Sequence, residues 1–197
     1  MRIRLFLFCA TALFLTGCAT ASKPGAEEYL LSGKAAEPLP DTETDMREVR
    51  IYPVRVAEFL SGNGMVMLGE NGQVHRAGRH LWAEPLSGQL TRTLRVGLAD
   101  RLPEINWQEE VVSAGKDSPV ILVRVDAFQV TGSGWAEIRG YWKLSRPEGD
   151  LIAKERFDIR RPLPDSGYPA MVRALNRGWS EVVDDLARKM AKIRVGG

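Results

Sequence analysis

Residues 135–144, WAEIRGYWKL, decide the fold, because apolar and polar side chains alternate along the whole stretch. A period of two is typical of a β-strand with one buried face. The apolar face comprises Ala136, Ile138, Gly140, Trp142 and Leu144, and the opposite face Trp135, Glu137, Arg139, Tyr141 and Lys143. Residues 151–159 alternate in the same way, and the apolar run 120–130 is a third strand candidate. Together these segments predict a sheet with one face in the core.

Two helical patterns flank these strands. Leucines recur every four residues from Leu86 to Leu98, with Pro85 suited to the first turn and Pro103 after the end. A longer apolar stripe predicts a second helix over about residues 169–193. This order predicts an α+β fold, in which two main helices pack on one face of a mostly antiparallel sheet.

Shorter strands are expected before the first helix. Tyr29-Leu30-Leu31 is a brief strand candidate, and residues 32–46 are rich in Pro, Glu and Asp, as loops are. Residues 49–59 suggest a strand with Pro53 near an edge or bulge. Asn71-Gly72 between two short apolar stretches predicts a hairpin.

The amino-terminal segment has the order of a bacterial lipoprotein signal. Arg2 and Arg4 precede an apolar run of about a dozen residues, too short for the roughly 20 needed to span a bilayer. Thr16 and Gly17 then stand before Cys18, as in a lipobox. We expect residues 1–17 to be cleaved, and Cys18 to carry a diacylglycerol and an acyl chain, since stable anchoring needs more than one chain. With Ala19 rather than Asp after the cysteine, the outer membrane, facing the periplasm, is the expected location.

The mature chain would consist of a tether and one domain. Residues 18–28 are predicted to be the lipidated cysteine and its flexible tether, and residues 29–197 a single domain with a full core. Cys9 would leave with the signal and Cys18 would carry lipid, so the domain has no thiol for a disulfide or a metal. Without Arg2 and Arg4 the charges balance, which argues against nucleic-acid binding.

Catalytic patterns are weak. His75 and His80, predicted in a hairpin and just before a helix, are too few for a metal site without cysteines. Gly62-Asn63-Gly64 and Gly132-Ser133-Gly134 read as turns rather than as a dinucleotide loop or a nucleophile elbow. We therefore predict no enzymatic activity, no metal and no cofactor other than the lipid on Cys18.

Aromatic side chains offer a different kind of site. Trp135 and Tyr141 fall on the polar face of their predicted strand, beside Arg139 and Lys143. They either lie under a loop or form a partner surface, since exposed aromatic residues are typical interface anchors. These four residues are the candidate partner-binding site.

A family resemblance rests on residues 80–86, HLWAEPL, followed by the leucine-striped helix. With the lipobox, Tyr29-Leu30-Leu31 and the Trp179 helix, this order resembles the ABC-type transport auxiliary lipoproteins of the PqiC (YmbA) family. Trp82, Glu84 and Pro85 are the most specific part of the resemblance.

The resemblance implies a docking role without catalysis. Such a protein would be the outer-membrane subunit of a lipid-transport and membrane-integrity system, with an MCE-domain protein and an inner-membrane transporter component as partners. Because MCE tubes are cyclic rings, a homo-oligomeric ring would match their symmetry. The alternative is an envelope lipoprotein with its own lipid-binding groove, or an assembly factor.

Overall fold

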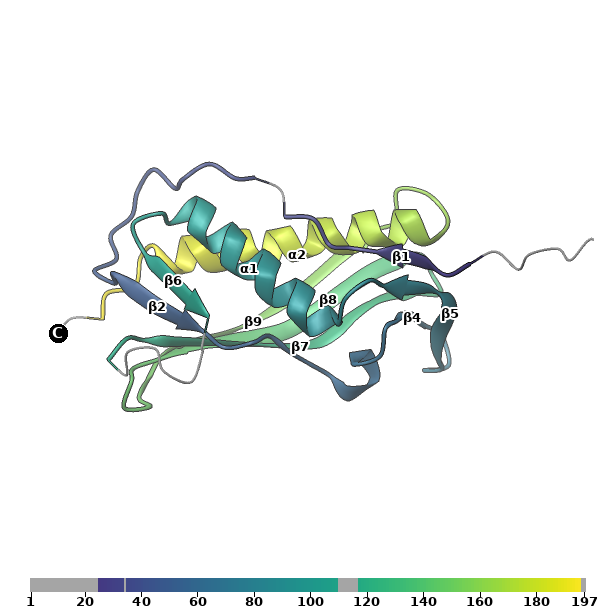
Figure 1. The fold of residues 1–197 in the computed structure, drawn as a ribbon, viewed down its shortest axis with the longest axis horizontal. Helices are drawn as coiled ribbons and strands as arrows, with labels where there is room; N and C mark the ends of the chain where they lie inside the picture. The colour runs from purple at the N-terminus through teal and green to yellow at the C-terminus, as the bar shows by residue number, and fades with distance from the viewer. Residues whose placement is uncertain (1–24, 34, 110–116, 196–197) are drawn as a thin grey trace, which may run out of the picture.

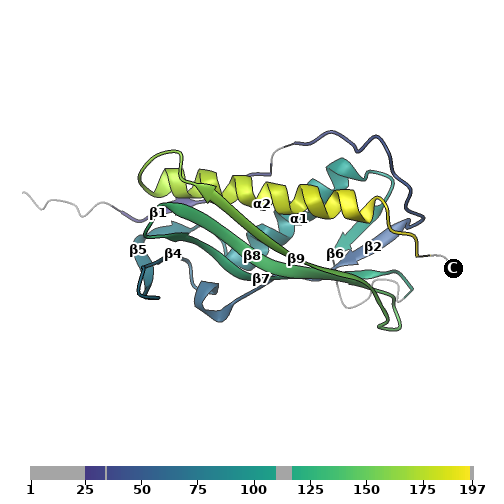
Figure 2. The same cartoon turned by 180° about the vertical axis from the view of Figure 1, so that it is seen from behind.

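The computed structural model describes residues 25–33, 35–109 and 117–195 and shows two helices packed on one side of a curled sheet. Helix α1 spans Leu86–Arg101 and helix α2 spans Tyr168–Met190. Both lie on the same face of the long strands, and Figure 2 shows these strands from behind. The predicted α+β class, with two helices on one face, is confirmed. The predictions for residues 1–24 lie outside the described residues.

The sheet contains nine strands within the described residues. Their bounds are β1 Glu27–Tyr29, β2 Glu48–Ile51, β3 Arg55–Val56, β4 Gly64–Leu68, β5 Val74–Trp82, β6 Asn106–Glu109, β7 Val120–Thr131, β8 Trp135–Ser145 and β9 Leu151–Pro162. The predicted Asn71-Gly72 hairpin connects β4 to β5, with Gly72 at φ 76°. The first strand starts at Glu27, so the last two residues of the predicted tether belong to the sheet.

The sheet is mixed rather than simply antiparallel. The long strands β7, β8 and β9 pair antiparallel, as do β4 and β5. Strands β2, β3 and β4 run parallel to β7 and pair with successive parts of it, and the β1–β5 and β2–β6 pairs are also parallel. The crossover through α1 brings these early strands beside the later ones.

The predicted strand over residues 49–59 is interrupted in the middle. The amides of Tyr52 and Ala57 donate to carbonyls of β7, but Pro53 between them has no N–H. The next amide, Val54, donates to the hydroxyl of Thr91 in α1 at 2.8 Å. The chain therefore leaves the sheet ladder briefly, and two short strands replace one.

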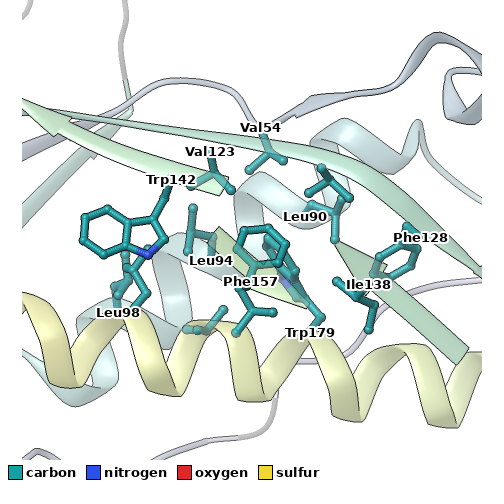
Figure 3. Close-up of a cluster of buried hydrophobic side chains, with 14 of the residues drawn as sticks. Val54, Leu90, Leu94, Leu98, Val123, Phe128, Ile138, Trp142, Phe157 and Trp179 are labelled. Atoms are coloured by element: carbon teal, nitrogen blue, oxygen red, sulfur yellow. The ribbon is translucent and has the colours of Figure 1, made fainter. Parts of the chain in front are cut away.

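The core fills the layer between the sheet and the helices. Figure 3 shows Trp142, Phe157 and Trp179 among leucines of α1 and aliphatic side chains of the sheet. The indole N–H of Trp179 donates to the hydroxyl of Thr93 at 3.0 Å, so its polar atom is satisfied inside the core. Trp142 and Trp179 thus take the core positions that their sequence periodicity predicts.

The two helices contact their neighbours through glycines. A Cβ on Gly178 of α2 would lie 2.3 Å from Cδ1 of Ile138 in β8, and one on Gly97 of α1 would lie 2.8 Å from Cγ1 of Val183 in α2. Arg101 of α1 forms an ion pair with Asp184 of α2. The close approach fixes α2 against the inner face of the sheet. Neither helix, nor any other within the described ranges, is both long and apolar enough to span a bilayer.

Candidate docking face

The four predicted partner-binding residues share the face of β8 that points away from the helices. Ala136, Ile138, Trp142 and Leu144 are buried on the inner face, as the alternation predicts. Cross-strand partners share a face, so the registers of β7 and β9 extend the opposite face across three strands. We call this surface the outer face; it comprises Leu122, Arg124, Ala127 and Gln129 of β7, Trp135, Glu137, Arg139, Tyr141 and Lys143 of β8, and Lys154, Arg156, Asp158, Arg160 and Pro162 of β9. Asp126, at the irregularity of β7, joins the outer face through its contacts with Arg124 and with the hollow beside Tyr141.

Trp135 begins β8 at one end of the outer face. Its side chain is 37% exposed, although the other large aromatic of the strand, Trp142, is only 2% exposed. The guanidinium of Arg160 lies 5.0 Å from the ring centroid, within the range of a cation–π contact. The ring therefore lies at the surface in contact with Arg160.

Tyr141 lies six residues along the strand, about 20 Å from Trp135. The ammonium of Lys154 lies 5.0 Å from its ring centroid. A hollow of about 320 Å³ opens beside it, lined in part by Arg139, Tyr141 and Arg156. The half-buried ring and the hollow together offer a place for a side chain of a partner.

Positive charge dominates the outer face. It carries six cationic side chains, Arg124, Arg139, Lys143, Lys154, Arg156 and Arg160, and three acidic ones, Asp126, Glu137 and Asp158. Glu137 lies between two of the cations, 3.3 Å from Arg160 and 3.8 Å from Arg139, and Asp126 pairs with Arg124 at 2.8 Å. Hydrogen bonding to Asp126 raises the pKa of Arg124. The net positive field favours a partner with acidic groups.

The sequence motif Trp82, Glu84 and Pro85 lies elsewhere and forms the corner between β5 and α1. Trp82 ends β5 and packs against Phe128 with ring centroids 6.1 Å apart. Pro85 is the residue before α1, and its carbonyl accepts hydrogen bonds from the first turn. Glu84 forms an ion pair with Arg92 at 3.6 Å. These residues define the turn into the helix and do not join the outer face.

Gln89 stabilises this corner, although the motif at residues 80–86 does not include it. Its Oε1 accepts the amide of Leu31 at 2.7 Å, and its Nε2 donates to the carbonyl of Glu84 at 2.9 Å. The side chain is fully buried. The position of Gln89 beside Leu90, at the edge of the leucine stripe, indicates a buried amide, and a buried amide needs hydrogen-bond partners.

The first strand pairs with the end of β5 that contains His80, whereas His75 lies further along β5 opposite Met67. His80 lies within β5, not in the segment before the helix, and its ring stacks on Tyr168 at 3.7 Å between centroids. Its Nδ1 lies 3.5 Å from the carboxylate of Glu27, which also accepts a hydrogen bond from the Tyr29 hydroxyl at 2.6 Å. That bond to Glu27, followed by burial, raises the pKa of Tyr29 to about 12. Across the described residues no group of three or more His, Cys, Asp or Glu side chains could hold a metal ion.

Comparison with known proteins identifies the family of this chain. A family model of the ABC-type transport auxiliary lipoprotein component matches residues 29–187. The chain therefore belongs to this family of transport auxiliary lipoproteins, as the HLWAEPL element and the helix pattern predict. The family is one of transport components rather than of enzymes.

Individual relatives agree with this assignment. The chain is 27% identical over 191 residues to the intermembrane transport lipoprotein PqiC of Escherichia coli K12, covering 97% of this chain and all of that protein. A crystal structure of an uncharacterized protein is 30% identical, with a TM-score of 0.70 over 85% of this chain and 99% of that one. A crystal structure of a Xanthomonas campestris protein, 15% identical, has a TM-score of 0.71 over 84% and 95% of the two chains and shows the fold alone.

Proposed function

We propose that this chain is a non-enzymatic lipoprotein subunit that docks an MCE-type lipid-transport tube to the outer membrane. Its membership in the family of transport auxiliary lipoproteins supports the transport role. The proposal further includes an MCE-domain partner, an inner-membrane transporter component and a location at the outer membrane. Lipid on Cys18 would hold the domain at the membrane, and the outer face would bind the end of the tube.

The observation that carries the proposal is the accessible part of the outer face on β8 and β9; its β7 residues Ala127 and Gln129 are buried. Both helices pack on the inner face of β7, β8 and β9, so the outer side of β8 presents Trp135 and Tyr141 with cations around them. Exposed aromatic and arginine side chains are the residue types that most often carry binding energy at interfaces. The excess of cations would also steer an acidic partner surface towards it.

A ring of several copies would fit this role. A tube built from cyclic rings presents repeated equivalent surfaces, and a cyclic oligomer can contact all of them with the same face. In the proposed ring, every copy turns its outer face towards the tube. Native mass spectrometry at micromolar concentration should show one closed oligomer, and a monomer would exclude the ring.

The docking face is tested by pull-down of the MCE-domain protein of the same organism. The double variant Trp135→Ala and Tyr141→Ala should lower the affinity at least about tenfold, or about 1.4 kcal/mol. Val96→Ala is the matched control, because Val96 is also exposed (38%) but lies on α1, on the other side of the sheet. Equal binding by the double variant and the wild-type chain would exclude this face.

The anchor is tested separately on the full chain. Cys18→Ser should remove the diacylglycerol and acyl mass from the mature protein and move it from the membrane fraction to the soluble fraction. Retention of both the added mass and the membrane location in Cys18→Ser would contradict lipidation at this residue.

A further inference from the structure

An apolar hollow opens at the end of the layer between sheet and helices. It has a volume of about 510 Å³, within the usual range of about 300–1,000 Å³ for ligand pockets. Its lining includes Met67, Val130, Leu163, Tyr168 and Met171. These side chains come from β4, β7, the segment after β9, and the first turn of α2. We call it the apolar hollow.

The polar groups of the apolar hollow are few. Besides the Tyr168 hydroxyl they are Thr131 at the end of β7 and, before the start of α2, Asp165 and Ser166, which are both exposed. The hollow beside Tyr141 is instead lined by Arg139, Arg156 and two aspartates. The chemistry of the apolar hollow therefore suits a hydrocarbon chain rather than an anion.

Its position relates the apolar hollow to the membrane anchor. Tyr168 in its lining stacks on His80, and His80 contacts Glu27 in the first strand. Figure 1 shows β1 and the start of α2 at the same end of the molecule. Cys18 precedes Glu27 by nine residues, which can span at most about 30 Å. Lipid on Cys18 would therefore keep this end of the domain close to the bilayer surface.

We propose that the apolar hollow binds one acyl chain of a phospholipid from the membrane that carries the anchor. This inference rests on the proposed anchor at Cys18. An acyl chain loses little by moving from the bilayer into an apolar cavity, and it removes the lining of the hollow from water. The occupied hollow would hold the α2 end of the domain against the membrane and give the subunit direct contact with a lipid.

The test uses the full lipidated chain in vesicles of phosphatidylethanolamine and phosphatidylglycerol. A small fraction of the phosphatidylethanolamine carries a diazirine at the end of one acyl chain. After illumination, mass spectrometry of the peptides should place the adduct on residues 163–171 or on Met67. Ser166→Trp, which fills the opening from an exposed position, should lower this labelling at least about fivefold.

Two further variants distinguish a blocked hollow from a misfolded domain. Leu163→Asp puts a carboxylate into the hollow and should also lower labelling, whereas Leu151→Trp should leave it unchanged. Leu151 is 59% exposed and begins β9, at the opposite end of the strand from Leu163. Circular dichroism of all three variants should match that of the wild-type chain.

The outcomes distinguish the inference from the function on which it rests. If the wild-type chain floats with the vesicles but carries no adduct at the hollow, the inference alone is overturned. The same holds if the Ser166→Trp variant is labelled as strongly as the wild-type chain. A chain that neither floats nor labels would overturn the anchor and the inference together.

Discussion

The two faces of β8 have different surroundings although they belong to one strand. Trp142 and Trp135 lie on the same strand, seven residues apart, and point to opposite faces because the side-chain period of a strand is two. The inner tryptophan packs under α1 and α2, and the outer one lies beneath Arg160 in contact with solvent. A residue type therefore indicates its role here only together with its position in the alternation.

The largest expected difference between the faces is in stability. Trp142→Ala should lower the free energy of unfolding by about 3–5 kcal/mol, because it leaves a cavity in the core. Trp135→Ala should change it by less than about 1 kcal/mol. Urea denaturation of both variants measures the two effects. Similar losses would mean that the outer face is part of the core.

A smaller loss of stability is expected from a substitution where α2 approaches the inner face of the sheet. Gly178→Ala should cost about 1–3 kcal/mol, because its Cβ would meet Ile138 of β8. Gly88→Ala is the matched control, since Gly88 is also helical and no atom lies within 4 Å of its added Cβ. Thermal unfolding should separate the two variants by several degrees. Equal melting temperatures would show that the helix can move away without cost.

The smallest effect concerns the charges of the outer face. Arg160→Ala removes the cation over Trp135 and the ion pair with Glu137, and should cost less than about 1 kcal/mol. The same variant should weaken binding of the MCE-domain partner more strongly at low than at high salt. Calorimetry at two ionic strengths measures this dependence, and a salt-independent loss would argue against electrostatic steering.

The sequence predicts which face of β8 is buried, because a regular spacing of apolar residues indicates directly which side chains face the core. The alternation in residues 135–144 separates the inner and outer faces correctly, and the leucine stripe locates α1. Both signals are local, since each depends only on neighbours within the same element.

Features that depend on distant segments were not predictable in the same way. The parallel pairing of β2, β3 and β4 with β7 joins residues more than 60 positions apart and depends on the crossover. Pro53 indicates an edge or bulge, but the partner of the following amide, Thr91, lies in another element, and the apolar hollow depends on four separate segments. Neither has a periodic signature within its own stretch of sequence.

Photo-crosslinking tests the central claim, the docking role of the outer face, most directly. A photoreactive residue replaces Arg139 on the outer face or, in a matched chain, Val96 on α1, and the MCE-domain partner is added. We predict a crosslink to the partner from position 139 and none from position 96. Crosslinking from position 96 alone would contradict the claim and place the partner on the helical side.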